Sequence, residues 1–126
     1  MKIDYLFLKQ LCNLMIEHES YTISTLELLD ELKDLQKSIA DIDDKYYRHL
    51  LLLKDCHVIE EVTGRNLGCS YLTNESMLRA DCLIRLTLSG YDFSEMLNKR
   101  GFIEKVKKMS ISSALFIGKQ MAEQWN

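Results

Sequence analysis

A near absence of chain breakers constrains this sequence more than any other feature: its 126 residues include no proline and only five glycines. Sandwiches and barrels of short strands need frequent turns, which glycine and proline usually supply. A disordered chain would be poor in apolar residues, whereas 47% of this sequence is apolar. We therefore expect residues 1–126 to form a single, mainly helical domain with a core of its own.

Apolar residues recur at helical spacing through the first half of the chain. The spacing predicts a helix over residues 4–19 that Asp4 caps. A short β-prone stretch at 21–23 precedes Ser24-Thr25-Leu26-Glu27, whose capping-box pattern predicts the start of a second helix. A third helix is expected over 45–56, because the aspartates before it complement a helix dipole. The apolar residues expected to face the core are Leu6, Leu8, Leu11, Cys12, Met15 and Ile16 in the first helix, Leu26, Leu29, Leu32 and Leu35 in the second, and Leu50 to Leu53 in the third.

The hydrophobic period changes after the third helix. Residues 58–63 and 82–87 are rich in β-branched and apolar side chains, which predicts the two strands of a ribbon. The segment between them, 64–81, is expected to form a long, irregular tip, with a glycine turn at 64–68 and a second extended piece that begins at Cys69.

The last part of the chain returns to helical patterning. Ser89-Gly90-Tyr91-Asp92 has the form of a capping box and predicts a helix that runs through Asn98. A short basic helix is expected over 102–109, and Ser110 is expected to cap a final helix. The apolar side of that final helix includes Leu115, Met121 and Trp125, which exceeds what a small core needs.

The expected elements follow one another as helix, short strand, helix, helix and ribbon. This is the order of a winged helix, so we expect an α+β fold, mainly α, with three helices and a β-hairpin wing. Residues 89–126 then form a C-terminal helical extension. The extension is a candidate element for homodimerisation, and packing of its last helix against the first helix is the alternative.

Two segments carry a resemblance to a known family. The first is His49-Leu50-x-Leu52-Leu53 followed by Val58-Ile59-Glu60, and the second is Arg85-Leu86-Thr87-Leu88-Ser89-Gly90-Tyr91-Asp92-Phe93. They resemble the third helix with the first wing strand, and the wing-to-helix junction, of the domain of unknown function twenty-five-thirteen. Members of this family are common in phages and mobile elements. Leu88, Tyr91 and Phe102 stand where the family usually has tryptophan, histidine and tryptophan.

The resemblance covers roughly residues 40–110. It implies a winged-helix-like fold and an origin in a phage or mobile element. It carries no agreed biochemical role and no catalytic residues, and a shared fold alone says little about function.

The charge of the chain is uneven. Its net charge is −3, but residues 1–62 carry seven basic and thirteen acidic side chains, whereas residues 63–126 carry nine and six. Compact DNA-binding proteins are usually basic, so this composition is evidence against strong sequence-independent binding to DNA. An anionic partner would meet the second half, unless the mixed surface serves only to keep the protein soluble.

Contacts to double-stranded DNA, if they exist, are expected at the start of the third helix and on the wing. Aspartates at the same helix end would repel phosphates. His49 also suits a second role, packing within the helices and bonding to backbone. A second basic group, which suits either phosphate binding or a solvated face, comprises Lys99, Arg100, Lys105, Lys107 and Lys108. The candidate DNA contacts are Lys37, Lys45, Arg48, His49, Arg65, Asn66 and Arg79.

The sequence offers little for catalysis or for a metal. Its four cysteines, Cys12, Cys56, Cys69 and Cys82, include no closely spaced ligand pair of the kind found in zinc sites. The turn at 64–68 lacks the lysine of a phosphate-binding loop, and no known nucleophile signature is present. We therefore expect no metal, no cofactor and no enzymatic activity. Without a signal peptide or a long apolar run, we expect a cytoplasmic chain with reduced thiols and no membrane contact.

Two functions remain open from the sequence. The first is a DNA-binding regulator of phage or mobile-element origin. The second is a protein–protein interaction module, such as a phage-encoded inhibitor or adaptor that does not bind DNA. A positive stripe joining the third helix to the wing would favour DNA, and a negative third-helix face would favour a protein partner.

Overall fold

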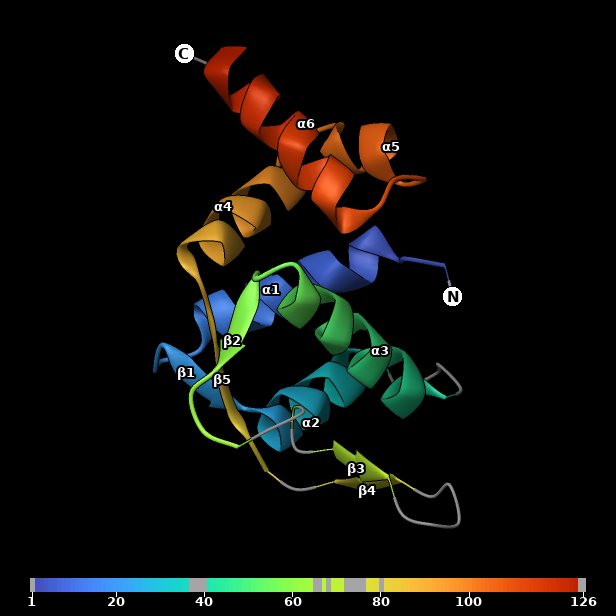
Figure 1. The fold of residues 1–126 in the computed structure, drawn as a ribbon, viewed down its shortest axis with the longest axis vertical. Coiled ribbons are helices and arrows are strands. Elements are labelled where there is room, and N and C mark those ends of the chain that lie inside the picture. Colours follow the sequence, from blue (N-terminus) through green and yellow to red (C-terminus); the bar gives the residue numbers. More distant parts are fainter. Residues whose placement is uncertain are drawn as a thin grey trace.

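The computed structural model describes residues 2–36, 41–64, 67, 69–71, 77–79 and 81–124 and shows a mainly helical α+β fold (Figure 1). The described residues contain six helices, a three-stranded antiparallel sheet and a separate two-stranded hairpin. In chain order the elements are α1 (Tyr5–Glu17), β1 (Thr22–Ser24), α2 (Thr25–Leu35), α3 (Ile42–Asp55), β2 (Ile59–Glu61), β3 (Cys69–Tyr71), β4 (Met77–Arg79), β5 (Leu83–Leu86), α4 (Leu88–Leu97), α5 (Phe102–Val106) and α6 (Ile111–Gln124).

The main sheet has the strand order β1-β5-β2, and β5 pairs antiparallel with both neighbours. Ile84 of β5 lies opposite Ile23 of β1, and Leu86 lies opposite Ile59 of β2. All four side chains are buried, so one face of the sheet contributes to the core. The pairing brings β1, which directly precedes α2, next to a strand some 60 positions further along the chain, as the register Thr22 to Arg85 shows.

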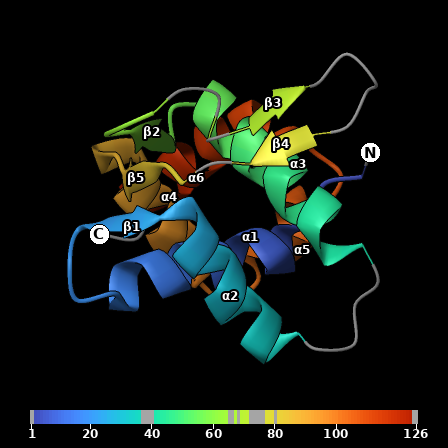
Figure 2. The same ribbon diagram turned by 90° about the horizontal axis from the view of Figure 1, so that it is seen from below.

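Helix α1 lies between two groups of helices. Figure 1 shows α4, α5 and α6 at one end of the molecule and α2, α3 and the β3–β4 hairpin towards the other. Seen along the long axis, the sheet lies to one side of α1, α2 and α3 (Figure 2). The Tyr5 hydroxyl donates a 2.7 Å hydrogen bond to the carbonyl of Met109, and Asn13 and Asn98 exchange side-chain hydrogen bonds. Helix α4 therefore packs on α1, and α5 and α6 pack on α4. A role of the C-terminal helices in dimerisation stays a prediction.

Three helix starts agree with the sequence. The side chain of Asp4 accepts a hydrogen bond from the Phe7 amide at 3.1 Å, and Ser24 accepts one from Glu27 at 3.1 Å. Ser110 accepts one from the Ser113 amide at 3.2 Å at the start of α6. These caps satisfy amides that have no partner within their own helix.

The start of α4 corrects the sequence prediction. The helix begins at Leu88, and its cap is Thr87 rather than Ser89. The Thr87 hydroxyl accepts from the Gly90 amide at 3.0 Å and donates to the carbonyl of His57 at 2.6 Å. The threonine therefore joins α4 to the end of α3. The local sequence allows either Thr87 or Ser89 to cap the helix, and the long-range bond to the His57 carbonyl favours Thr87.

Part of the expected core is exposed. Burial in α1 falls on Tyr5, Phe7, Leu8, Leu11, Cys12 and Met15, because this helix packs on both sides. Five residues predicted to face the core are exposed instead, namely Leu6, Ile16, Leu26, Leu35 and Leu51.

The tip of the ribbon contains a hairpin, of which the sequence predicted only the first strand, the extended piece that begins at Cys69. Strands β3 and β4 pair antiparallel, with Cys69 opposite Arg79 and Tyr71 opposite Met77. The glycine turn predicted at 64–68 falls mostly outside the described residues. Of its members, Gly64 has a positive φ of 83° and Leu67 is buried.

Candidate functional site

The outward side of α3 is the first place to look for a binding surface. The helix buries Ile42, Tyr46, Tyr47, His49, Leu50 and Leu53, which share one side at helical spacing. The opposite side carries Asp44, Arg48, Leu51 and Asp55, and all four are exposed. Leu51 is 43% exposed and gives this stripe an apolar centre.

The basic residues of α2 and α3 do not offer free positive charge. Each of the four basic side chains within these two helices forms an ion pair with a carboxylate. Exposed pairs of this kind contribute about 0–1 kcal/mol to stability. They do, however, offset the positive charge that a phosphate would meet. The pairs are Lys33 with Asp43 at 3.0 Å, Lys45 with Asp4 at 2.6 Å, Arg48 with Asp44 at 2.8 Å, and Lys54 with Glu61.

Carboxylates outnumber these lysines and arginines. Helices α2 and α3, with the cap Asp41, carry eight carboxylates against four basic side chains. On α2, Asp30 and Asp34 point to solvent and have no ion pair among the described residues. We call the exposed residues Asp30 and Asp34 of α2, together with Asp44, Leu51 and Asp55 of α3, the acidic helix face. Its charge is negative at neutral pH.

His49 is a packing residue, which corrects its assignment as a DNA contact. It is only 1% exposed. Its Nδ1–H donates to the Lys45 carbonyl at 2.8 Å, and its Nε2 accepts from the Asp4 amide at 3.1 Å. Burial lowers the pKa of His49, and the bond to the Lys45 carbonyl opposes this shift only partly. The neutral ring therefore ties the start of α1 to α3 and has no nitrogen left for a nucleic acid.

Lys45 is tied into the same contact. Its ammonium group pairs with Asp4 and lies 4.7 Å from the centre of the Phe7 ring. Burial raises the pKa of Asp4, but the hydrogen bonds from Lys45 and from the Phe7 amide outweigh it, so the pKa is lowered. Lys45 thus serves the packing of α1 on α3, whereas Arg48 remains exposed beside Asp44.

The remaining predicted DNA contacts are not assembled by the described residues. Lys37, Arg65 and Asn66 lie outside the described part of the chain. Arg79 has its backbone in β4, and its side chain is likewise outside the description.

Part of the second basic group borders a hollow of about 570 Å³. Lys107 and Lys108 line it together with Lys2 and Lys45. Lys107 pairs with Glu104 at 3.0 Å, and Lys45 pairs with Asp4. Half of these four lysines are therefore offset by a carboxylate in the same hollow.

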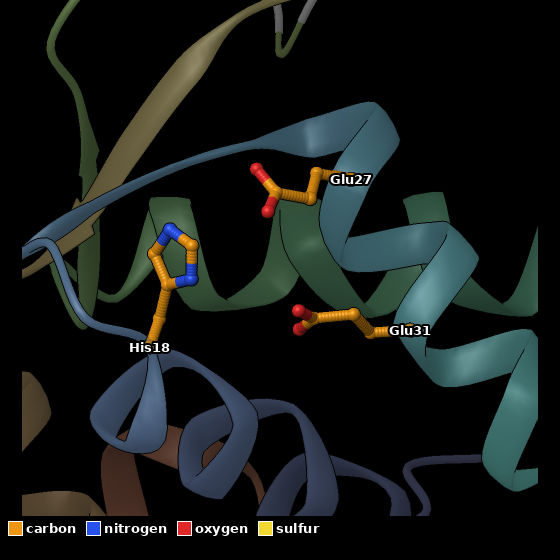
Figure 3. Close-up of side chains that lie close together, drawn as sticks. All are labelled: His18, Glu27 and Glu31. Atoms are coloured by element: carbon orange, nitrogen blue, oxygen red, sulfur yellow. The ribbon is translucent and has the colours of Figure 1, made fainter.

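A different cluster lies between α1 and α2. His18 follows the last residue of α1, and Glu27 and Glu31 are one turn apart on α2. Their ligand atoms all lie within 4.8 Å of one another (Figure 3). The cysteines were the only residues whose spacing was compared with metal sites, so the sequence did not predict this cluster. The spacing of Glu27 and Glu31 in the sequence predicts that they lie on the same side of a helix. The position of His18 cannot be predicted in this way, because it depends on how α1 packs on α2.

Cys12 and Cys82 are buried thiols. Cys12, Cys56 and Cys82 are free. Burial raises the pKa of Cys12 to about 12. Burial also raises the pKa of Cys82, whose thiol donates to the Thr63 carbonyl at 2.7 Å. A thiol that stays protonated is a poor nucleophile.

Comparisons of this protein with protein-family models, with curated proteins and with solved structures found no match. In the described part of the chain, no helix combines the length and the apolar character needed to cross a membrane.

Proposed function

We propose that this protein is a non-enzymatic winged-helix module that binds a basic surface of a protein partner through its acidic helix face. The order α1-β1-α2-α3-β2-β5 and the strand order β1-β5-β2 support the fold assignment. In this assignment α3 takes the place of the recognition helix. The connection between β2 and β5, which includes the β3–β4 hairpin, takes the place of the wing.

The charge of α2 and α3 is the observation that carries the proposal. These are the helices that a winged-helix protein presents to DNA. Here each of their basic side chains is already paired, and Asp30 and Asp34 form no ion pair with any residue that the structure describes. A surface of this sign repels phosphates and attracts a lysine- or arginine-rich surface.

The stripe on α3 also has the make-up of a protein interface. Leu51 is exposed between Asp44 and Asp55, one helical turn or more to each side. Protein interfaces place apolar anchors at the centre, where water is excluded, and charged groups at the rim. In our proposal Leu51 is the anchor, and the two aspartates steer the partner towards it.

DNA is the second candidate, and the element order favours it, because helix-turn-helix proteins commonly place such a helix in the major groove. In that case Arg48 would have to leave Asp44 to contact a phosphate or a base. The wing would have to supply the remaining positive charge from Arg65 and Arg79 and a polar contact from Asn66, and Lys37, which falls between α2 and α3 in the sequence, would add a further positive charge. An origin in a phage or mobile element is compatible with both candidates.

Charge reversal on α3 tests the proposal. Asp44→Lys with Asp55→Lys should abolish capture of a partner from cell lysate. Asp92→Lys with Glu95→Lys makes the same change of charge at exposed positions of α4 and should leave capture intact. Equal capture by both double variants would contradict the assigned surface.

A gel shift on the unmodified protein decides between the two partners. The probe is a pool of random duplex DNA at about 50 and 200 mM salt, a range over which phosphate contacts weaken strongly. We expect no shift at either salt concentration. A salt-sensitive shift that Asp44→Lys with Asp55→Lys strengthens would establish DNA as the partner and refute the proposal.

A further inference from the structure

We infer that His18, Glu27 and Glu31 form a binding site for a divalent transition-metal cation, with zinc as the best fit to the donor set. The three residues come from two elements that pack against each other, the end of α1 and the first two turns of α2. Figure 3 shows both carboxylates directed towards the imidazole ring.

Local structure fixes the backbone on both sides of the cluster. The amide of His18 donates to the carbonyl of Leu14 at 3.1 Å, which holds the residue at the end of α1. Ser24 caps α2 by accepting from the Glu27 amide, so the first turn of α2 is fixed as well. Glu31 follows Glu27 by one helical turn and therefore projects from the same side.

The spacing of the ligand atoms suits one ion. The three atoms lie within 4.8 Å of one another. Bonds from zinc to imidazole nitrogen and carboxylate oxygen measure about 2.0–2.2 Å, so two ligands of a tetrahedral ion lie about 3.4 Å apart. Each pair of ligand atoms must therefore approach by at most about 1.4 Å. Rotation about the side-chain torsions of two glutamates and a histidine supplies such a movement without a change of backbone.

The three side chains lack other partners. In the part of the chain that the structure describes, neither carboxylate nor the imidazole forms an ion pair or a hydrogen bond with another side chain. Glu27 and Glu31 are like charges one turn apart on a helix, and such a pair is unfavourable until a cation neutralises it.

The surroundings leave room for an incomplete coordination shell. The cluster lines an open hollow of about 450 Å³ together with Leu14, Glu17 and Glu19. Water can therefore fill the fourth position of a tetrahedral ion, and Glu17 and Glu19 add negative charge near it. Partial exposure of all three ligands gives an ion direct access from solvent.

The donor set selects among cations. Imidazole suits zinc and its neighbours among the transition metals, whereas magnesium and calcium prefer shells made only of oxygen. One nitrogen and two carboxylates therefore favour zinc, and cobalt serves as its spectroscopic substitute. A bound ion would join the end of α1 to α2 across the connection that contains β1. The site does not depend on the proposed partner, because Glu27 and Glu31 lie outside the acidic helix face.

Calorimetric titration of zinc into the purified, untagged full chain tests the inference. We expect one zinc ion per chain, no competition by excess magnesium, and a rise in the zinc dissociation constant of more than about tenfold in His18→Ala and in Glu31→Gln. Asp30→Asn is the matched control, since it removes a carboxylate from the same helix outside the cluster, and it should bind zinc as the unmodified chain does. Circular dichroism checks that each variant keeps its helices.

Cobalt identifies the ligands independently of affinity. Cobalt held by imidazole and carboxylates lacks the strong near-ultraviolet absorption of cobalt–thiolate bonds, so its spectrum separates this site from the cysteines. We expect weak visible bands that disappear in His18→Ala. Zinc binding that His18→Ala leaves unchanged, a thiolate spectrum, or no binding at about 1 mM zinc would each overturn the inference. Glu31→Gln should still capture the protein partner as the unmodified chain does. Failure of the zinc site is therefore distinguishable from failure of the proposed function, in which the unmodified chain itself captures no partner.

Discussion

Gly90 marks the closest approach of α4 to the rest of the protein, and its replacement by alanine should destabilise the fold. A Cβ at this position would lie well under 3.0 Å from the Val58 carbonyl oxygen and 2.9 Å from Cδ2 of Leu86. Ordinary contacts between carbon and a carbonyl oxygen are about 3.3–3.6 Å. The oxygen cannot simply withdraw, because it accepts hydrogen bonds from the Thr87 amide at 3.0 Å and from the Thr87 hydroxyl at 3.1 Å.

The size of the expected destabilisation follows from one stabilising and two destabilising contributions to the free energy of unfolding. Alanine gains up to about 1 kcal/mol over glycine in a helix. Overpacking a buried site costs about 1–3 kcal/mol. Weakening both hydrogen bonds to the Val58 carbonyl adds about 0.5–1.5 kcal/mol for each bond. We therefore expect Gly90→Ala to lower the free energy of unfolding by about 3 kcal/mol, within bounds of about 1–6 kcal/mol, and to lower Tm by roughly 10 °C in a chain of this size.

Gly118 provides the matched control, since it is also a buried helical glycine. The three atoms nearest to a Cβ there all belong to the side chain of Met96, whose thioether is flexible and can move aside. Gly118→Ala should therefore change the free energy of unfolding by less than about 1 kcal/mol, because the gain in helix propensity offsets the repacking. Urea denaturation followed by circular dichroism measures both variants. A Gly90→Ala variant as stable as Gly118→Ala would refute the assigned contact between α4 and the end of α3.

Two further predictions concern the packing of α3. Burial lowers the pKa of His49 in the folded state, so the unfolded chain binds the proton more tightly. The stabilisation of the fold by neutral His49 is therefore complete above about pH 6.5 and is lost as the pH falls through the lowered pKa. The free energy of unfolding of His49→Gln should therefore vary less between pH 7 and pH 5 than that of the unmodified chain, and an equal pH dependence would contradict this. Leu53 is fully buried, so Leu53→Ala should lower the free energy of unfolding by about 2–5 kcal/mol, whereas Leu51→Ala at the exposed neighbouring position should change it by less than about 1 kcal/mol, as urea denaturation would show.

The sequence predicted most reliably what is decided within a few residues. The caps at Asp4, Ser24 and Ser110 depend on a side chain and an amide three positions apart, and all three form. The order of helices and of the strands β1, β2 and β5 also follows from local periodicity. The start of α4 could not be predicted from local periodicity, because Thr87 is selected as the cap by its bond to the distant His57 carbonyl.

Long-range contacts explain the other differences. Exposure of Leu51 beside buried Leu50 depends on the rotation of α3 about its axis, which the run of four leucines leaves open. Lys45 and Asp4 are 41 positions apart, so no sequence window shows that they pair. His18 reaches Glu27 and Glu31 only once α1 and α2 have packed. The sites of this protein thus depend on tertiary structure more than its elements do.

The contacts that build α3 and the charged groups that it exposes lie on opposite sides of the helix. The Tyr46 hydroxyl donates to the Thr25 carbonyl at 2.6 Å, and His49 bonds to the start of α1, all within the protein. Asp44 and Asp55 take no part in these contacts. Charges on the outward side can therefore change sign at little cost to folding, since isolated surface substitutions usually change stability by no more than about 0.5 kcal/mol. For this reason a winged-helix assignment does not by itself select DNA as the partner, and the sign of the charge at the outward positions of α3 is the better guide.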